Sequence, residues 1–335
     1  MSAGAPLAEA RLAARLLALA PSALGGMVLR GGGPARERVV EHLLALLGPE
    51  VPIRRLPVQI DDERLLGGID LAASLALGRP VRGRGLLEEV AGGVLIVPLA
   101  ERLDESLAGR IAQAMDEGSG FTLLLLDDGI ATEEVPPAAL RERVAFALDL
   151  SAVASLETDE ETIRSSLLAD VALADDEALS ALAAAAMTLG IGSARADRFA
   201  HAAARAHAAV QGRTVIAEED LAAAARLVLA PRATRLPETA NDEPPPGEEP
   251  AGEPGEGDGQ SGKPLDDRVL DAARAALPAD LLARLAADQR AGRGSGGGKG
   301  RKVVSRLRGR PLGARPGMPR GGARLALVDT LRAAV

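Results

Sequence analysis

Short apolar runs alternate with stretches of helical periodicity over the first part of the chain. Apolar residues recur at helical spacing over 6–20 and 34–47, which predicts two amphipathic helices. The runs at 26–30, 94–97 and 121–128 are short, aliphatic and bounded by glycine, proline or turn residues, as buried parallel strands are. Strands that alternate with helices predict an α/β fold, a parallel sheet with helices on both faces.

Further elements complete this first domain. The segment "VPIRRLP" at 51–57 reads as a short extended piece, and 61–80 as one helix-like stretch closed by glycine and proline. A helix should cover 104–118, and "VAFALDL" at 144–150 should form the last strand. We therefore place the α/β domain over residues 1–155.

The hydrophobic pattern changes after this domain. Four alanine-rich amphipathic stretches follow, separated by glycine or by acidic residues that can cap helices. They predict a small all-α domain over 156–235.

Two segments of opposite charge come next. Residues 237–262 contain eight acidic and no basic residues, and 290–324 contain eleven basic and no acidic ones. The Pro/Glu/Gly-rich stretch 236–264 cannot bury enough apolar surface to fold, so we predict a disordered acidic linker there. Residues 265–289 predict short helices, and 290–335 a basic Gly/Arg-rich segment.

Composition excludes several classes of protein. Hydrophobic residues make up 47% of the 335 residues, but the chain has no Cys, Trp or Tyr and three His. Without cysteine there are no disulfides, thiolate metal sites or cysteine nucleophiles, which fits a reducing cytoplasm. No apolar run approaches the roughly 20 residues that span a bilayer, and we find no export signal. We therefore expect a cytoplasmic protein without a membrane span.

The basic segment has two interpretations. It is an arm for anions or nucleic acid, or it is a solvated spacer. Aromatic residues make up 1% of the chain, so the stacking platform used for single strands is missing, and the acidic linker can satisfy the basic charge. We favour the spacer and do not expect nucleic acid as a partner.

The stretch "GGMVLRGGGPARERVVEHLLAL" at 25–46 has the strand, glycine loop and helix order of a phosphate-binding loop. Laid on G-x-x-x-x-G-K-[ST] from Gly31, the lysine position falls on Glu37. Gly31, Gly32 and Gly33 thus keep the frame of a nucleotide loop, while Glu37 puts a negative charge where a cation should meet phosphate. Taken alone, an ordinary strand, turn and helix explains the stretch equally well.

Two carboxylate clusters invite a metal-site interpretation, Asp61–Glu63 and Asp127-Asp128. The first lies where a helix should begin, and acidic side chains suit the positive end of the helix dipole. The second ends a strand before a glycine and suits a turn. We therefore predict no metal site in the chain.

Three phrases together resemble the magnesium chelatase branch of the AAA+ ATPases. "GRGLLEEVAGGVLIVPLAERLDESLAGRIAQAMDEG" is similar to the segment around that family's second nucleotide motif, and "PPAALRERVAFALDL" to a later segment. "LGIGSARADRFAHAAARAHAAVQGRTVIAEEDLAAAARLVLAPR" is similar to its helical lid. The acidic linker after the lid resembles that of the D-subunit family. The resemblance covers roughly residues 5–332 and implies an AAA+ P-loop-type sheet followed by a lid.

In that family, which serves (bacterio)chlorophyll synthesis, the D subunit partners an I subunit that hydrolyses ATP with Mg²⁺, and a large H subunit holds the porphyrin. The resemblance implies an enzyme only as a complex, magnesium chelatase, which inserts Mg²⁺ into protoporphyrin IX. This chain would be a non-hydrolysing platform and allosteric partner for the I subunit, without a cofactor of its own. The family continues into an integrin-like domain with an Asp-x-Ser-x-Ser metal motif; no such motif occurs here, so we expect no function that depends on it.

The nucleotide motifs depart from the family's active pattern. Pro34 removes a backbone N–H from the loop, and a carboxylate at Glu37 would repel phosphate by about 1 kcal/mol at 4 Å in water, more near a protein surface. An active second motif places Asp-Glu after its strand, where this chain has Pro98-Leu99. Glu101, two residues further on, is interpreted as a helix-entry or surface carboxylate.

Two arginines match functional positions of the family. Arg143 matches the arginine finger, which reaches the ATP site of a neighbouring subunit and stabilises charge on the transferred phosphate. The alternative is a surface charge beside Glu142. Arg195 matches the lid arginine that senses nucleotide in the same subunit, a role that is vestigial without a competent pocket. Helix capping or a pair with Asp197 is its alternative.

Two rival functions stay open at this point. One is an active NTPase of the same fold with an atypical loop, which should bind Mg-ATP by itself. The other is a nucleic-acid-binding adaptor that uses the basic segment, which should bind DNA or RNA with a steep salt dependence.

Overall fold

The computed structural model describes residues 5–118, 120–153, 168–235 and 264–277, together with Leu282 and Leu285. The predicted linker, through Lys263, and the basic segment 290–335 lie outside the described residues. Residues Met1–Ala287 form one compact unit, which contains both the sheet and the helical domain after it.

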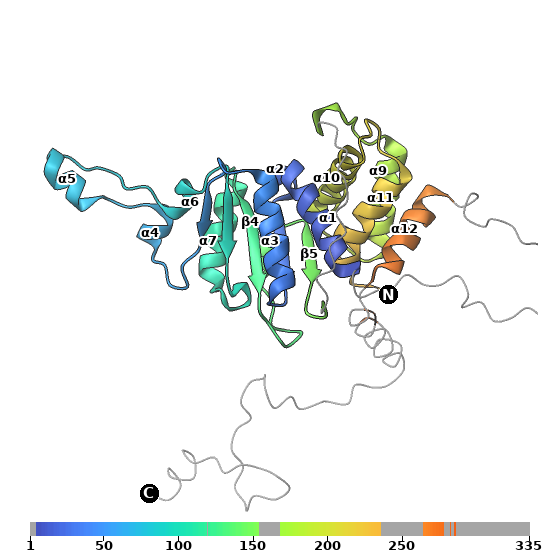
Figure 1. The fold of residues 1–335 in the computed structure, drawn as a ribbon, viewed down its shortest axis with the longest axis horizontal. Helices are drawn as coiled ribbons and strands as arrows, with labels where there is room; N and C mark the ends of the chain where they lie inside the picture. The colour runs from blue at the N-terminus through green and yellow to red at the C-terminus, as the bar shows by residue number, and fades with distance from the viewer. Residues whose placement is uncertain are drawn as a thin grey trace, which may run out of the picture. The chain divides into compact units, whose positions relative to one another are not determined.

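Five parallel strands form the sheet, in the order β2-β3-β4-β1-β5 (Figure 1). The strands are β1 (Gly26–Arg30), β2 (Ile53–Arg55), β3 (Val94–Val97), β4 (Thr122–Asp127) and β5 (Phe146–Asp149). In the register of the sheet, Met27 lies opposite Leu124 on one side and Phe146 on the other. The predicted parallel α/β sheet is confirmed, including the position of each strand.

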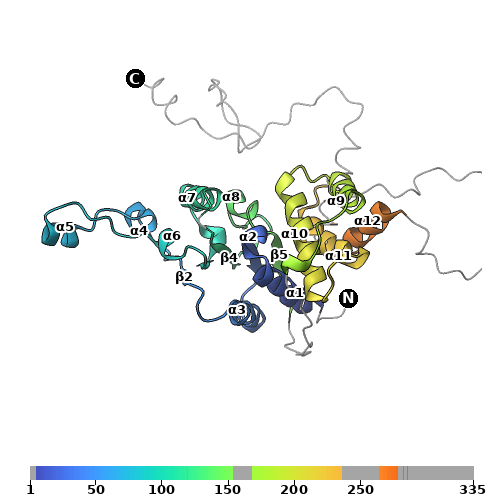
Figure 2. The same cartoon turned by 90° about the horizontal axis from the view of Figure 1, so that it is seen from above.

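Alternate residues of the strands face two separate cores. Leu29 and Leu124 belong to the core under α1 and α3, whereas Val28 and Leu95 belong to the core under α7. These helices are α1 (Ala5–Leu19), α3 (Pro34–Leu47) and α7 (Glu105–Asp116). Figure 2 shows α3 and α7 on opposite sides of the sheet. Helices therefore cover both faces, as the aliphatic strands require.

The predicted start of α7 is confirmed by its cap. The carboxylate of Asp104 accepts hydrogen bonds from the backbone N–H groups of Ser106 at 2.9 Å and Leu107 at 3.3 Å. Such a bond satisfies N–H groups that have no partner within the helix. The helix ends at Asp116, two residues before Gly118, which adopts a positive φ of 86°.

The stretch 61–80 was predicted as one helix, and this prediction is wrong. It forms two short helices, α4 (Asp62–Leu66) and α5 (Leu71–Leu77), separated at Gly67. The chain returns against this break: a Cβ added at Gly85 would lie 2.3 Å from the backbone nitrogen of Gly67. A continuous helix cannot accept so close a backbone neighbour, so tertiary contact overrides local propensity.

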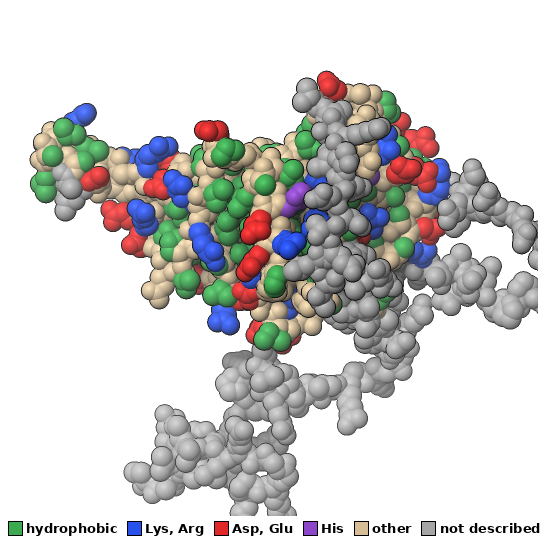
Figure 3. Space-filling model, in the orientation of Figure 1, with side chains coloured by type: hydrophobic (Ala, Val, Ile, Leu, Met, Phe, Trp, Pro, Cys, Tyr) green, Lys and Arg blue, Asp and Glu red, His purple; other side chains and the backbone are tan. Residues whose placement is uncertain are grey.

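The α5 segment lies at the end of an arm that extends away from the sheet (Figures 1 and 2). Several of its apolar side chains are exposed, with Leu75 at 76% and Ile69 at 62%. Figure 3 shows hydrophobic side chains gathered on this arm. Before the next strand the chain forms one more short helix, α6 (Leu86–Glu89), which contacts α4.

The helical domain after the sheet, here called the lid, has three of the four predicted alanine-rich helices; the first, predicted over 161–173, lies outside the described residues up to position 167. They are α9 (Asp176–Thr188), α10 (Ala194–Val210) and α11 (Glu218–Ala224), continued by helical turns at Ala225–Leu229 and Ala230–Arg232. A later helix, α12 (Leu265–Ala275), contacts α9 and α11. The first of the predicted short helices at 265–289 therefore completes the lid.

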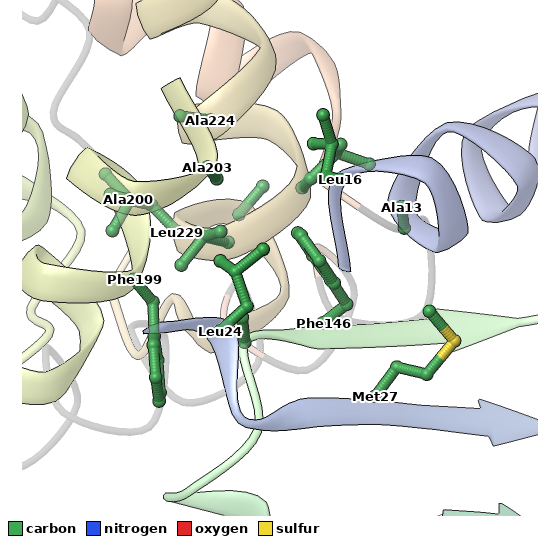
Figure 4. Close-up of a cluster of buried hydrophobic side chains, with 14 of the residues drawn as sticks. Ala13, Leu16, Leu24, Met27, Phe146, Phe199, Ala200, Ala203, Ala224 and Leu229 are labelled. Atoms are coloured by element: carbon green, nitrogen blue, oxygen red, sulfur yellow. The ribbon is translucent and has the colours of Figure 1, made fainter. Parts of the chain in front are cut away.

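The lid and the sheet share one hydrophobic core. Figure 4 shows Leu24, from α2 (Pro21–Leu24), and Phe146 beside Phe199 and Leu229 of the lid. Since alanine side chains are small, α10 can approach the end of the sheet closely. The sheet and the lid are thus joined by buried apolar surface rather than by a loose hinge.

Candidate functional site

The glycine loop, Gly31–Gly33, lies at the edge where the strands end, here called the carboxyl edge. The N–H of Gly31 donates to the carbonyl oxygen of Asp127 at 3.0 Å, and its φ is 86°. A Cβ at this position would lie 2.7 Å from the backbone nitrogen of Ser151. Glycine at position 31 is therefore required by packing alone, without any nucleotide.

The loop is shorter than the sequence motif suggests. Helix α3 begins at Pro34, with Gly33 as its N-cap, so three residues separate it from β1. Glu37, which the motif places at the lysine position, lies in the first turn of this helix with an exposed side chain, and the predicted helix over 34–47 is confirmed. The first helical position, where the dipole favours an anion, is held by proline, which has no N–H to donate.

Two arginines at the carboxyl edge are bound by acceptors of the same chain. Nη1 of Arg36 donates to Oδ1 of Asp128 at 2.6 Å, and the Arg36 side chain is 14% exposed. Nη2 of Arg30 donates to the carbonyl oxygen of Ala131 at 2.7 Å, and its Nη1 lies 3.3 Å from Oδ2 of Asp127. Both guanidinium groups thus have internal partners.

Glu101 is not the surface carboxylate that the sequence suggested. Its side chain is 3% exposed, and its Oε2 accepts a hydrogen bond from the N–H of Asp128 at 3.0 Å. It lies in a short helical turn, Ala100–Arg102. This agrees with the alternative interpretation, in which Glu101 is a carboxylate at the start of a helical segment. Glu101 therefore supports the turn that places Asp128 against Arg36.

The two carboxylate clusters serve as a turn and a cap. Oδ1 of Asp127 accepts from the N–H of Gly129 at 2.9 Å, and burial raises the pKa of this carboxyl group. Asp61 caps α4 through a 2.7 Å bond from the N–H of Arg64. Within the ranges that the structure describes, no three His, Asp or Glu side chains form a metal-binding group.

A cavity of about 440 Å³ opens at the carboxyl edge beside β2, β3 and β4. Arg36 and Asp128 line it together with the aliphatic Val58, Pro98 and Leu99. Leu99 has a φ of 49°, the one positive value among the described non-glycine residues. The cavity is large enough for a small molecule; of its charged lining residues, Arg36 and Asp128 bind each other, and Arg55 is exposed.

Arg143 lies at the opposite, amino edge, where the strands begin. A Cβ added at Gly25, just before β1, would meet the carbonyl oxygen of Arg143 at 2.1 Å. The five residues of β1, about 16 Å at 3.3 Å per residue, separate this edge from the glycine loop. The Arg143 side chain is 20% exposed, and its guanidinium binds the carboxylate of Asp116, not that of its neighbour Glu142.

Arg195 meets the same carboxylate. Its Nη2 donates to Oδ1 of Asp116 at 3.0 Å, so its partner is Asp116 rather than Asp197, the partner in one of the alternative interpretations. The hydrogen bond from Arg143 is the main cause that lowers the pKa of Asp116. The two arginines singled out by sequence are thus brought together, away from the glycine loop of their own chain.

Further bonds attach the lid to this edge. Arg232 donates to the carbonyl oxygens of Ala145 at 2.8 Å, of Val228 at 2.7 Å and of Val144. Burial lowers the pKa of Arg232 to about 10, and its guanidinium lies 5.9 Å from the ring centre of Phe199. The short segment just after Arg143 is therefore fixed to the lid.

Sequence reasoning missed Asp116 and Arg232. A signal for Asp116 was present, because an acidic side chain in the last turn of a helix opposes the helix dipole and so suggests a cationic partner. Arg232 follows the apolar run "LVLAP", and an arginine beside such a run is a candidate for burial with several acceptors.

The comparisons with known proteins agree with this geometry. The family model of the AAA lid domain matches residues 179–251. The "Magnesium-chelatase 60 kDa subunit" of Cereibacter sphaeroides is 40% identical over 98% of this chain. This chain belongs to that magnesium chelatase subunit family. Its sheet and lid therefore form an AAA+ module.

Other members of the family extend the match. The 60 kDa subunit of Rhodobacter capsulatus is 38% identical over 95% of this chain, and the 67 kDa subunit of Chlorobaculum tepidum is 31% identical over 71%. The chain spans 60%, 59% and 45% of the length of these three relatives. Among the described helices, none is long and apolar enough to cross a membrane.

Proposed function

We propose that this chain is a non-hydrolysing AAA+ member of a magnesium chelatase, the complex that inserts Mg²⁺ into protoporphyrin IX in (bacterio)chlorophyll synthesis. Its partners are the I subunit, which binds and hydrolyses ATP with Mg²⁺, and the large H subunit, which holds the porphyrin. The chain acts as a platform for the I subunit and supplies Arg143 to an ATP site of that neighbour.

The absence of hydrolysis is supported by the chemistry of the glycine loop. A phosphate-binding loop needs a lysine for the β/γ-phosphates and a hydroxyl group for Mg²⁺. The chain has no lysine before Lys263, and its first helical turn after the loop reads Pro34-Ala35-Arg36-Glu37. Its one nearby cation in that turn, Arg36, is held by Asp128.

The role of Arg143 rests on one observation, the position of its guanidinium. It binds Asp116 at the end of α7, and the backbone of Arg143 lies beside Gly25 at the amino edge, the length of a strand away from the glycine loop of its own chain. An arginine there cannot serve its own loop but can meet a nucleotide held by a neighbouring subunit. Arginine fingers supplied to a partner contribute about 10³ to 10⁵ in rate in GTPases.

The test is the ATPase rate of the I subunit in the presence of this chain. With Arg143→Ala we expect the rate that depends on this chain to fall at least tenfold, because the developing charge on phosphate loses its cation. Arg141→Ala is the matched control, since Arg141 is an exposed arginine two residues earlier, at the end of the short helix α8 (Ala138–Arg141), and its loss should leave the rate unchanged. Equal rates for all three proteins would exclude the finger.

A second measurement addresses hydrolysis by the chain itself. Calorimetry with Mg-ATP should detect no micromolar binding, because the loop lacks its lysine and Arg36 is occupied. Micromolar binding that Glu37→Ala leaves unchanged would favour the rival interpretation, an active NTPase with an atypical loop.

A further inference from the structure

Asp116 and Arg195 both occupy unfavourable helix ends. Asp116 is the last residue of α7, where the helix dipole disfavours an anion, and Arg195 is in the first turn of α10, where it disfavours a cation. Each placement costs free energy by itself. The contact between their side chains offsets that cost, so the two ends are stable as a pair.

We infer that Asp116 is the positioning residue for Arg143 and that it couples this arginine to the lid through Arg195. The inference rests on the proposed function, in which Arg143 serves a neighbouring ATP site. Asp116 itself contacts no substrate. It sets the direction of the guanidinium and makes that direction depend on the lid.

The geometry of the pair leaves Arg143 free to bind phosphate. Nε donates to Oδ1 of Asp116 at 3.1 Å, Nη2 donates to Oδ2, and Nη1 donates to the carbonyl oxygen of Ala139 at 2.7 Å. A guanidinium has five N–H donors in a planar fork. Three of them are used here, and the remaining two lie on Nη1 and Nη2. A bidentate carboxylate thus fixes the plane of the fork while its outer side can meet an anion.

The lid shares this arrangement through three connections. Arg195 binds Asp116, and Oγ of Ser193 donates to Oε2 of Glu142 at 2.9 Å. Arg232 binds the carbonyl oxygens of Val144 and Ala145. The lid thus binds the residue before Arg143, Glu142, and the residues after it, Val144 and Ala145. A rotation of α10 would therefore move Arg143 together with the lid.

The experiment measures the ATPase of the I subunit with the full chain and with Asp116→Ala, Arg143→Ala and the double variant. Both the maximal rate and the concentration of chain at half-saturation are recorded. We expect Asp116→Ala to lower the maximal rate about 10- to 100-fold, the size of effect that a misplaced group has. The concentration of chain at half-saturation should not change, because Asp116 binds Arg143 and does not itself contact the I subunit in the proposed arrangement. The double variant should be no slower than Arg143→Ala.

Controls separate positioning from a structural role. Glu117→Ala removes the next acidic side chain, which is exposed and bonds Gln113, and should leave both quantities unchanged. Asp116→Glu, which keeps the charge, should recover part of the rate. Should Asp116→Ala fold poorly in circular dichroism, Asp116→Asn retains an acceptor and is expected to give the same fall in maximal rate.

Each outcome decides between the two proposals. A normal rate with Asp116→Ala but a slow one with Arg143→Ala overturns the positioning role and leaves the proposed function standing. Losses that add in the double variant also overturn it, since Asp116 would then act on something other than Arg143. Normal rates with both single variants remove the proposed function and the positioning role together.

Discussion

At the carboxyl edge of the sheet, Arg36 is bound by Asp128 and Arg30 by oxygens of the loop after β4. At the amino edge, two arginines from different parts of the chain share one carboxylate, Asp116, which is 43% exposed. Two arginines of the first edge are thus bound within the chain, whereas at the second edge two arginines share a single carboxylate close to solvent. Since the length of β1 separates them, nucleotide chemistry can be lost at one edge while a cation is retained at the other.

The largest effect should come from the attachment of the lid to the amino edge. Arg232→Met leaves the carbonyl oxygens of Val144, Ala145 and Val228 without their donor. Each such loss costs about 1 kcal/mol, so the free energy of unfolding should fall by about 3 kcal/mol. Urea unfolding measures this change.

A matched arginine provides the control for that substitution. Arg226 lies in the same part of the lid but pairs with Glu9 at the surface, where its side chain is 39% exposed. Arg226→Met should cost less than about 1 kcal/mol, as exposed ion pairs do. Equal losses for the two variants would show that the amino edge does not depend on Arg232.

The next effect concerns the glycine loop. Gly31→Ala should lower the free energy of unfolding by about 2 kcal/mol, because alanine is strained at its φ of 86° and its Cβ would meet the backbone of Ser151. Gly33→Ala, at a φ of 101° with nothing within 4 Å of the new Cβ, should cost about 1 kcal/mol. If both variants lose the same free energy in thermal unfolding, packing of Gly31 against Ser151 does not determine the conformation of the loop.

A smaller effect should follow from loss of the internal ion pair. Arg36→Gln should cost about 1 kcal/mol, since its bond to Asp128 is partly buried. Arg84→Gln removes a pair with Glu88 in which both side chains are well exposed, and should cost nothing measurable. If Arg36→Gln also leaves the free energy of unfolding in urea unchanged, the carboxyl edge does not depend on the ion pair between Arg36 and Asp128.

The smallest effect is a contrast in pH dependence between the edges. The pKa of Asp116 lies below its ordinary value of 3.8, so its stabilising effect is lost as the pH falls through the folded-state pKa. The pKa of Asp127 lies above 3.8, so stability falls as the pH rises from 3.8 through the folded-state pKa. Asp116→Asn and Asp127→Asn should therefore change the slope of stability with pH in opposite directions.

Urea unfolding of both variants from about pH 2 to 6 measures these slopes, because the Asp116 effect lies below its ordinary pKa of 3.8 and the Asp127 effect above it. If the two substitutions change the slope of stability with pH in the same direction, the opposite pKa shifts of Asp116 and Asp127 are contradicted. The effect of Asp116→Asn should also shrink at high salt, because its side chain is close to solvent and its ion pairs are screened.

Much of the fold could be predicted because hydrophobic periodicity is local. The aliphatic runs at Val94–Val97 and Thr122–Asp127 predicted buried strands, and the alanine-rich stretches predicted the lid helices. Helix ends that depend on a cap, such as that at Asp104, were also readable. The stretch 61–80 was not, because its break at Gly67 is set by the returning backbone at Gly85.

The candidate site could be predicted only in part. Gly31 and the missing lysine were visible in the sequence, and so were Arg143 and Arg195 through their resemblance to family positions. The sequence could not show that Glu101 is buried, because its partner, the N–H of Asp128, lies 27 residues away. The start of α3 at Pro34, in contrast, was predicted, and it places Glu37 in the helix.

By itself, the amino-acid sequence determined the succession of strands and helices along the chain, the sheet covered by helices on both faces and the absence of the P-loop lysine, because each depends on residue type and on neighbours a few positions away. Only the tertiary structure decided that Arg143 and Arg195, 52 positions apart, meet on Asp116. That meeting depends on the packing of α7, α8 and α10 against one end of the sheet. Contacts between distant segments are set by how the cores close, and no local pattern of residues encodes them.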